Sequence, residues 1–416
     1  MNVLWTVNSI MPEVAKSLGL NSGHAISWVS AMSRRLSYNK DIKLAIASSG
    51  NVKNVEFKEL DNILFIVLPL DWNVKDYWEI VFSRFKPDIM HLYGTESAHN
   101  KILVERYSDI PSVISLQGIL TEYIRHFYAG IDFSTMLRFT TLKDLFFPTG
   151  FFSEKRNMQK RSMTERKILQ MAKYVEGRST WDRVSSMNIN PSLTYYYCPR
   201  LIRGAFYERK WSINNVERYT IFASQGYSPE KGLHFLFEAL GKLKTKYPNV
   251  RLYVAGYDKI TSKAIQHKYF PSGYIKYLKF LIKKYDIANN IEFLGKLSAN
   301  DVARYMEKSN IVVISSSIEN APNTLAEAMI VGAPTVASFV GGNMDMLKHN
   351  EEGYLYTFNE PNMLAEYITN IFDSDELATK FSNNSFHTAR ERHNPLVLES
   401  TLLTIYNDVI NKEMTK

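Results

Sequence analysis

The fold can be predicted from residues 311–338, which read IVVISSSIENAPNTLAEAMIVGAPTVAS. Residues 311–317 form a β-branched run of strand length, residues 324–331 an apolar helical stretch, and residues 334–338 a second short strand. A strand, a helix and another strand in this order are the crossover unit of a parallel sheet. This stretch therefore predicts an α/β domain.

The same alternation extends over most of the chain in both directions. Further strands are expected at residues 3–7, 42–48, 63–70, 87–94, 111–118, 219–224, 251–256 and 291–295. Because helical stretches separate most of them, helices should cover both faces of each sheet. The predicted fold class is α/β, with two Rossmann-like doubly wound domains facing a cleft.

The alternation lapses once. Residues 123–167 are aromatic and basic, and they form either helical hairpins or a mobile flap; a helix is expected at 166–178. Residues 190–211 resemble a connector to the second half, with the domain boundary near residues 203–215. We therefore place an N-terminal domain at 1–205, a C-terminal domain at 206–393, and at 394–416 a terminal helix that crosses back to the N-terminal domain near the junction.

The amino-acid composition and net charge exclude several classes of protein. The 416 residues are 45% hydrophobic and 22% charged, which excludes collagen-like and disordered chains. No apolar run approaches the ~20 residues that span a bilayer, and the N-terminus reads as a strand rather than a signal peptide. The single cysteine, Cys198, cannot form an intramolecular disulfide and suits a cytoplasmic protein. The formal net charge of +8 favours anionic partners such as nucleotides, polyanions or a negatively charged membrane face.

Two glutamates carry the most informative signal. Glu319 follows the strand 311–317, and Glu327 lies in the second turn of the next helix, with Pro322 at its start. The helix N-terminus offers unpaired N–H groups and a partial positive charge that suit a diphosphate, and the carboxylates can accept hydrogen bonds from sugar hydroxyls. We assign Asn320, Asn323 and Thr324 to the same donor site. The alternative is that both glutamates are solvated surface residues.

Lys231 and Gly232 form a second candidate element in SQGYSPEKGLHF, between a strand and a helix. A lysine there can reach a phosphate, and the glycine permits close backbone approach. Lys231 could equally be an ordinary exposed lysine.

The remaining candidates lie on loops at other strand ends. Gly23 can face the donor across the cleft, and the candidates for the acceptor or cleft are Gln117, Gly118, Arg178, His24 and Gly342. Some have a simpler interpretation: Gly341 and Gly342 as an ordinary turn, His24 as incidental, and Arg178 as a structural ion-pair partner.

Taken in order, these motifs resemble the retaining nucleotide-sugar glycosyltransferases of glycosyltransferase family 4, which have the GT-B double-Rossmann fold. The resemblance rests on PEKG with Lys231, the AG at 255–256, IEFLG, the E-x7-E pair with EAMIVGAPTVAS, and GGNMD followed by EEGYLY. KPDIMHLYGTE, VISLQG and EGRSTWDRVSSMNINP resemble the bacterial subgroup that assembles capsule, exopolysaccharide or lipopolysaccharide.

The resemblance implies a mechanism. The C-terminal domain would bind the nucleotide-diphosphate sugar and the N-terminal domain a glycan or lipid-linked acceptor. Glu319 would meet the transferred sugar, Glu327 the ribose and Lys231 the diphosphate, so Glu319 and Lys231 are the catalytic candidates. It implies a front-face retaining displacement in which the departing phosphate accepts the incoming proton.

No metal site is expected, because positive groups can neutralise the diphosphate and no D-x-D loop follows a strand in the expected place. No cofactor is expected either.

The sequence departs from many relatives at two positions. Gly226 stands where they have an arginine, and Gln117 where they have a histidine. Leaving-group stabilisation would then rest more on Lys231 and the helix N-terminus, and the transferred sugar could differ from the common ones.

Other readings remain open. The basic and aromatic segments 138–161 and 268–284 either contact the inner face of an anionic membrane peripherally or form a solvated face over an aromatic core. The alternative enzyme is a GT-B-type nucleotide-sugar epimerase, which needs no acceptor. A non-catalytic polyanion-binding protein would rest on charge alone, and nucleic acid is not an expected partner because no base-reading motif is present.

Overall fold

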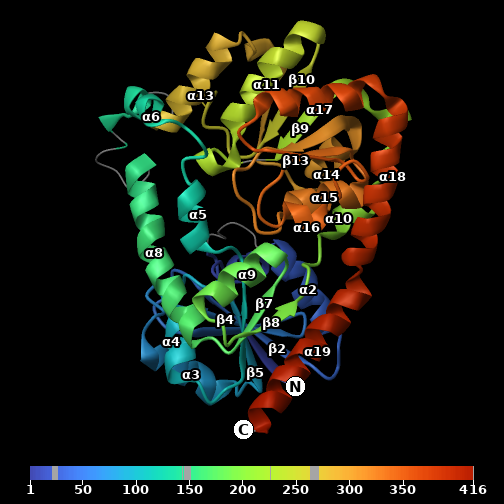
Figure 1. The fold of residues 1–416 in the computed structure, drawn as a ribbon. Coiled ribbons are helices and arrows are strands. Elements are labelled where there is room, and N and C mark those ends of the chain that lie inside the picture. The colour runs from blue at the N-terminus through green and yellow to red at the C-terminus, as the bar shows by residue number, and fades with distance from the viewer. Residues whose placement is uncertain (21–26, 143, 145–150, 225, 263–270, 416) are drawn as a thin grey trace. The chain divides into compact units, whose positions relative to one another are not determined.

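The computed structural model describes residues 1–20, 27–142, 144, 151–224, 226–262 and 271–415, which form two compact units (Figure 1). Unit 1 consists of residues 1–121, 160–203 and 393–416, and unit 2 of residues 122–159 and 204–392. None of the described helices is both long and apolar enough to cross a membrane.

Unit 1 contains a sheet in the order β3-β4-β2-β1-β5-β6-β7-β8. All neighbouring strands run parallel except the edge pair β3 and β4. The strands are β1 (Asn2–Thr6), β2 (Lys43–Ser49), β3 (Glu56–Leu60), β4 (Ile63–Leu68), β5 (Ile89–Tyr93), β6 (Ser112–Ser115), β7 (Tyr174–Gly177) and β8 (Thr194–Tyr197).

Helices cover both faces of this sheet, as expected for a parallel sheet. One core contains Trp5 with Leu398 and Leu402 of the last helix, and the other contains Leu4 with Trp78 and Leu169. The helices of unit 1 are α1 (Pro12–Ser17), α2 (Ser27–Ser37), α3 (Lys75–Arg84), α4 (Ala98–Arg106), α9 (Thr180–Ile189), α19 (Pro395–Met414) and the C-terminal part of α8 (Phe151–Met171).

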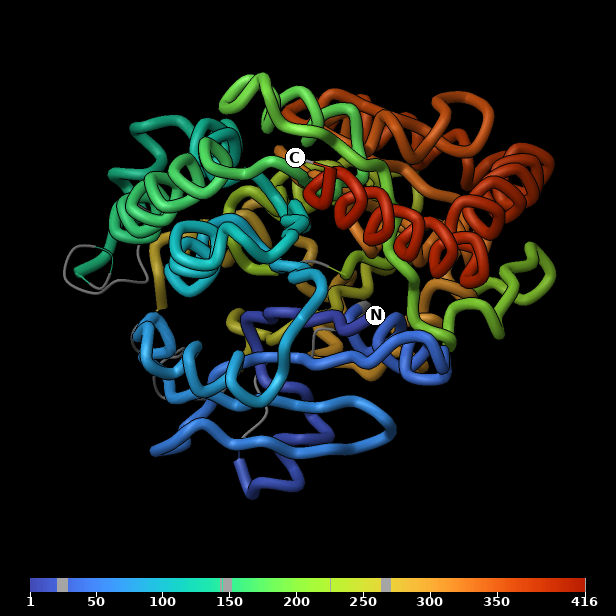
Figure 2. Tube along the Cα trace, turned by 90° about the horizontal axis from the view of Figure 1, so that it is seen from below, coloured from blue at the N-terminus to red at the C-terminus, as the bar shows by residue number. Residues whose placement is uncertain are grey.

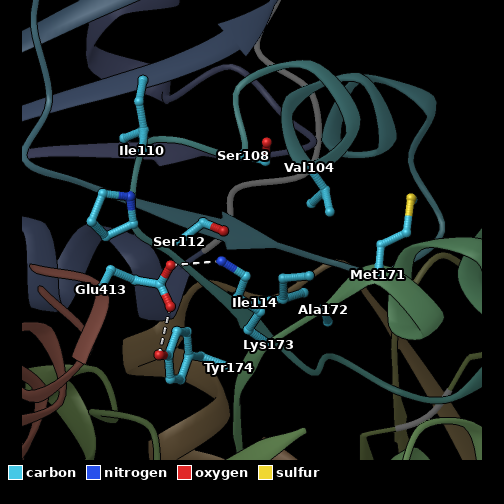
Figure 3. Close-up of a pocket in the computed structure, with 11 residues that line it drawn as sticks. Val104, Ser108, Ile110, Ser112, Ile114, Met171, Ala172, Lys173, Tyr174 and Glu413 are labelled. Atoms are coloured by element: carbon cyan, nitrogen blue, oxygen red, sulfur yellow. Dashed lines mark hydrogen bonds and ion pairs between the residues drawn. The ribbon is translucent and has the colours of Figure 1, made fainter. Parts of the chain in front are cut away.

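The C-terminal helix α19 belongs to unit 1, and Figure 2 traces it in red up to the C-terminus. Tyr406, fully buried, accepts a hydrogen bond from Trp5 Nε1 at 2.9 Å. Near the end of the helix, Glu413 accepts hydrogen bonds from Lys173 Nζ at 2.6 Å and from the Tyr174 hydroxyl at 2.7 Å, beside a small pocket of about 30 Å³ (Figure 3). The prediction that the last helix returns to the N-terminal domain is therefore confirmed.

Unit 2 contains an entirely parallel sheet in the order β11-β10-β9-β12-β13-β14. Its strands are β9 (Glu217–Ser224), β10 (Arg251–Ala255), β11 (Ile291–Gly295), β12 (Ser309–Ile314), β13 (Thr335–Ser338) and β14 (Tyr354–Tyr356). β9 pairs with β10 on one side and with β12 on the other, so the strand order reverses between β9 and β12. Ligands of open α/β sheets bind beyond the carboxyl ends of the strands at such a reversal.

The helices of unit 2 include a segment that precedes its sheet in the chain. They are α5 (Leu120–His126, which crosses the unit boundary), α6 (Phe133–Phe139), the start of α8, α10 (Gly204–Tyr207), α11 (Leu233–Lys246), α13 (Gly273–Lys284), α14 (Ala299–Lys308), α15 (Asn323–Val331), α16 (Asn343–Met346), α17 (Pro361–Asp373) and α18 (Asp375–Arg392). Short 3₁₀ turns are η1 (Ile213–Asn215), η2 (Pro229–Lys231) and η3 (Ala288–Asn290).

The compact units differ from the expected domains mainly in residues 122–159, which the sequence analysis had assigned to the N-terminal domain. In the structure this segment packs within unit 2, where Phe139 contacts Tyr277 and Phe280 of α13 with ring centroids 5.3 Å apart in each case. Its described part is mainly helical.

Two local predictions were wrong. The helix expected at 166–178 ends at Met171, and Tyr174–Gly177 forms β7, because Tyr174 and Val175 are buried between two neighbouring strands. The strand expected at 311–317 ends at Ile314, because Ser317 N donates to Glu230 O, at 2.7 Å, instead of to a strand.

Candidate functional site

Two loops of unit 2 follow the adjacent strands β9 and β12 and are joined by backbone and side-chain hydrogen bonds. Besides the bond from Ser317 N to Glu230 O, Ser315 Oγ donates to Lys231 O at 3.2 Å. The loop after β9 continues through η2 into α11, and the loop after β12 continues into α15. The reversal of strand order thus places the Lys231 and Glu319 segments together.

Gly232 allows these loops to approach closely. It has φ of 68°, and a Cβ at this position would lie 1.8 Å from Ser315 O. Only glycine combines this left-handed conformation with so short a backbone separation. The conformation ends η2 and begins α11 directly after Lys231.

Lys231 and Glu319 form the ion pair at the centre of the site. Lys231 Nζ lies 2.6 Å from Glu319 Oε1, and Ser316 Oγ donates to the same oxygen at 2.7 Å. Burial lowers the pKa of Lys231, but attraction by Glu319, with a smaller contribution from Glu230, outweighs it and raises that pKa overall. The lysine is therefore positively charged at neutral pH, and 31% of its side chain is exposed.

A third loop, after β13, fixes the backbone of Glu319. Gly342 N donates to Glu319 O at 3.0 Å, and a Cβ on Gly341 would lie 1.8 Å from the same oxygen. Ser338 Oγ, at the end of β13, donates to Ser316 O at 2.6 Å. Gly341 and Gly342, for which a place in the cleft and an ordinary turn were the two interpretations, therefore contact the Glu319 backbone directly.

Glu327 lies on the helix that the Glu319 loop enters. It is in the second turn of α15 and is buried. Asn323 and Thr324 open the helix and are half-buried; Pro322 is the N-cap and supplies no side-chain hydrogen bond. Asn320 is buried on the preceding loop. These residues place the positive end of a nine-residue helix next to the Lys231–Glu319 loops.

Gly226 precedes Lys231 on the β9 loop and leaves room beside it. A Cβ at Gly226 would lie 3.9 Å from Lys231 Cγ, an ordinary contact distance. A longer side chain at this position would therefore begin next to the lysine stem.

The described candidates of the N-terminal domain lie in unit 1. Gln117 and Gly118 follow β6 and are half-buried, and Arg178 follows β7. Arg178 Nη2 donates to Leu116 O at 3.2 Å and to Gln117 O at 3.1 Å, and Arg178 N donates to Asp182 Oδ2 at 2.9 Å. Arg178 thus holds the loop that carries Gln117. Gly23 and His24 lie outside the described residues.

The serines around Glu319 were not predicted from the sequence. Ser316, Ser317 and Ser338 each hydrogen-bond to the loops described above, Ser317 Oγ donating to Glu230 O at 3.3 Å. Three consecutive serines at 315–317, at the end of a predicted strand, were the available signal, since apolar residues are more usual in a buried strand.

Comparisons with known proteins bear on the family of part of the chain and on the fold. Residues 206–388 match the family model described as glycosyl transferases group 1. The putative glycosyltransferase YtcC of Bacillus subtilis is 26% identical over 181 residues, which cover 43% of this chain and 42% of YtcC. The chain therefore matches less than half of the length of this relative.

Several similar solved structures cover nearly the whole chain. Sucrose-phosphate synthase from Thermosynechococcus elongatus has a TM-score of 0.73 at 13% identity, with 99% of this chain and 100% of the other covered. HepE of Anabaena, in complex with UDP, has a TM-score of 0.69 at 17% identity, with 98% and 100% covered. The chain has the GT-B fold of two Rossmann-like domains, which confirms the predicted fold class, and its residues 206–388 resemble glycosyl transferases group 1.

Proposed function

We propose that this protein is a retaining glycosyltransferase of family 4 that binds a nucleotide-diphosphate sugar in unit 2 and transfers the sugar to a hydroxyl group. One observation carries the proposal: the Lys231–Glu319 ion pair lies where the strand order of the unit 2 sheet reverses, next to the N-terminus of α15. The match of residues 206–388 to glycosyl transferases group 1 supports it.

The donor diphosphate would take over the charge of Lys231. Partial exposure lets the ammonium group turn from Glu319 to a phosphate oxygen, while the N–H groups of Asn323 and Thr324 and the helix dipole act on the same negative charge. The lysine and the helix N-terminus act most strongly on the negative charge that develops on the diphosphate as its bond to the sugar breaks. This arrangement would compensate for the arginine that is absent at Gly226.

The two glutamates would divide sugar and nucleotide recognition. Ser316 keeps Glu319 oriented when Lys231 turns to the phosphate, so Glu319 can accept hydrogen bonds from hydroxyls of the transferred sugar. Glu327 would accept hydrogen bonds from the ribose. Transfer with retention would follow a front-face course, in which the leaving phosphate takes the proton of the acceptor hydroxyl.

A thermal-shift screen with nucleoside diphosphates and their sugar conjugates tests donor binding, because a ligand of the folded state raises its stability according to affinity. We begin with UDP because HepE was solved with UDP and with UDP-glucose. Binding of a sugar conjugate supports the proposal; no stabilisation by any conjugate would contradict it.

Product analysis with the bound donor then separates transfer from epimerisation. We expect slow release or transfer of a sugar with retained anomeric configuration, whereas an isomerised donor would indicate an epimerase. Full activity in excess EDTA is expected, since Lys231 and α15 supply the positive charge. Loss of activity that only magnesium or manganese restores would contradict metal independence.

The acceptor is proposed to be a glycan or a lipid-linked glycan in bacterial capsule, exopolysaccharide or lipopolysaccharide synthesis, and the reaction to be cytoplasmic. This assignment rests on the resemblance of residues 86–96, 113–118 and 176–191 to that subgroup. Transfer to lipid-linked acceptors, compared with free oligosaccharides of the same structure, tests it.

A further inference from the structure

Helix α6 in unit 2 exposes apolar side chains on one side. Phe133 and Leu137, one helical turn apart, are 63% and 55% exposed, and Leu142, three residues beyond the helix, is 74% exposed. The opposite side of α6 is packed, since Phe139 contacts two aromatic rings of α13, and Met136 at the flank is buried. Large apolar side chains grouped on a surface commonly mark an interaction site.

The element that carries these side chains is firmly fixed. Phe139 lies between Tyr277 and Phe280 of α13, and the Arg138 guanidinium lies 5.0 Å from the centre of the Phe280 ring. Asp132 caps α6 by accepting from Thr135 N at 2.8 Å. Figure 1 shows α6 beside α13 in unit 2. The exposed side chains therefore project from a packed helix.

α13 adds positive charge next to this apolar group. The buried residues of α13 are Gly273, Tyr274, Ile275, Leu278 and Leu281, and its lysines lie outside that set. The lysines are Lys276, Lys279, Lys283 and Lys284. No ion pair found among the described residues involves any of these lysines or Arg138.

We propose that the basic apolar surface, formed by Phe133, Leu137 and Leu142 together with Arg138 and the four lysines of α13, binds an anionic lipid bilayer. Amphipathic helices bind in this way, with apolar side chains among the acyl chains and cations at the headgroups. Three apolar side chains are too few for a stable protein interface of more than about 1,000 Å². They suffice for a bilayer when they act together with several cations that form no ion pair among the described residues.

Membrane binding by this surface is independent of the proposed transfer reaction. It can therefore be measured as binding to vesicles, without any enzymatic turnover. We expect the protein to float with vesicles of phosphatidylcholine and phosphatidylglycerol at low salt, and to bind pure phosphatidylcholine vesicles much more weakly. High salt should weaken the binding, since it screens exposed charges.

Two sets of substitutions separate the apolar and charged contributions. Phe133→Ser/Leu137→Ser should lower the vesicle partition coefficient about 100-fold, because two large side chains lose their apolar environment. Lys276→Glu/Lys283→Glu/Lys284→Glu should lower it at least about 100-fold. Phe133→Trp should raise it, because tryptophan favours the membrane interface.

Matched controls come from unit 1. Val184→Ser/Leu396→Ser replaces residues that are 54% and 69% exposed, and Lys16→Glu/Lys40→Glu/Lys53→Glu makes the same change in net charge. Both controls should keep at least most of the binding. The proposal is overturned if the α6 variant binds like its control, if neutral vesicles bind equally well, or if dextran sulfate competes fully while the Phe133 and Leu137 substitutions have no effect.

Discussion

Each unit holds a cation against a loop that follows a central strand, but the two cations are held differently. In unit 2, Lys231 binds a side-chain carboxylate and has 31% of its side chain exposed. In unit 1, Arg178 is only 5% exposed and binds the backbone carbonyl oxygens of residues 116 and 117. A ligand can replace Glu319 as the partner of Lys231 without leaving a backbone group unpaired. Removing Arg178 from its carbonyls would cost the desolvation of buried groups.

The largest effect is expected at Gly232, which permits the close loop approach in unit 2. Gly232→Ala should lower the free energy of unfolding by about 4 kcal/mol, because the new Cβ would clash with Ser315 O in addition to the left-handed strain. Gly295→Ala is the matched control, with φ of 69° and no atom within 4 Å of its Cβ, and should cost only about 1 kcal/mol. Denaturant unfolding measures both; equal costs would show that the loops can separate easily.

Lys231 should matter next most, and for activity rather than folding. Lys231→Met should lower kcat/KM about 100- to 1,000-fold through the loss of charge at the diphosphate. It should also lower the free energy of unfolding by about 2 kcal/mol, because the Glu319 carboxylate then keeps Ser316 as its single donor among the described residues.

The double variant Lys231→Met/Glu319→Gln separates these two effects. It should regain most of the stability, because no buried carboxylate is left without its cation, but not the affinity for a nucleoside diphosphate, which Glu319→Gln alone should keep. Recovery of that affinity along with stability would show that the lysine serves the fold alone.

A pH effect of about 3 kcal/mol is expected from His234 in unit 2. Its Nε2 lies 3.2 Å from Ala129 O and its Nδ1 3.1 Å from the Tyr274 hydroxyl, and burial lowers its pKa to about 4. As the pH falls, the unfolded chain therefore binds a proton at His234 before the folded chain does. The contribution of the neutral, buried His234 to the free energy of unfolding is fully present above pH 6.5, declines as the pH falls towards 4, and is lost below that. The difference in unfolding free energy between wild type and His234→Gln, measured across this range, should follow the decline; a constant difference would contradict it.

The smallest effect is expected at Arg178. Arg178→Ala should lower the free energy of unfolding by about 2 kcal/mol, because buried carbonyls lose donors, and should leave nucleotide affinity unchanged. Calorimetric titration with UDP checks the second part. A large loss of UDP affinity would place Arg178 in the donor site instead.

Several features of the site could be predicted from sequence because they are local. The PEKG loop and the helix after Glu319 have turn and cap signals in the residues themselves. The Lys231–Glu319 contact, by contrast, joins residues 88 positions apart and depends on which strands are neighbours. Ser316 and Ser338 were missed because polar residues at a strand end carry no periodic signal, and their partners are set by the packing of three loops.

The fold shows the same limit. The helices and strands of unit 2 follow from hydrophobic periodicity. The grouping of residues 122–159 with unit 2 depends on the packing of Phe139 against α13, a tertiary contact between segments far apart in sequence.

Calorimetric titration of the wild type, Glu327→Gln and Glu319→Gln with the nucleoside diphosphate that most stabilises the protein tests the central claim most directly; Glu292→Gln, at an exposed position of unit 2, is the control. If unit 2 binds the donor nucleotide through these loops, Glu327→Gln should weaken binding about 10- to 100-fold, while Glu319→Gln loses turnover and binds almost normally. Equal affinity in the wild type and Glu327→Gln would contradict the assignment of the ribose to Glu327 and, with it, the donor site proposed here.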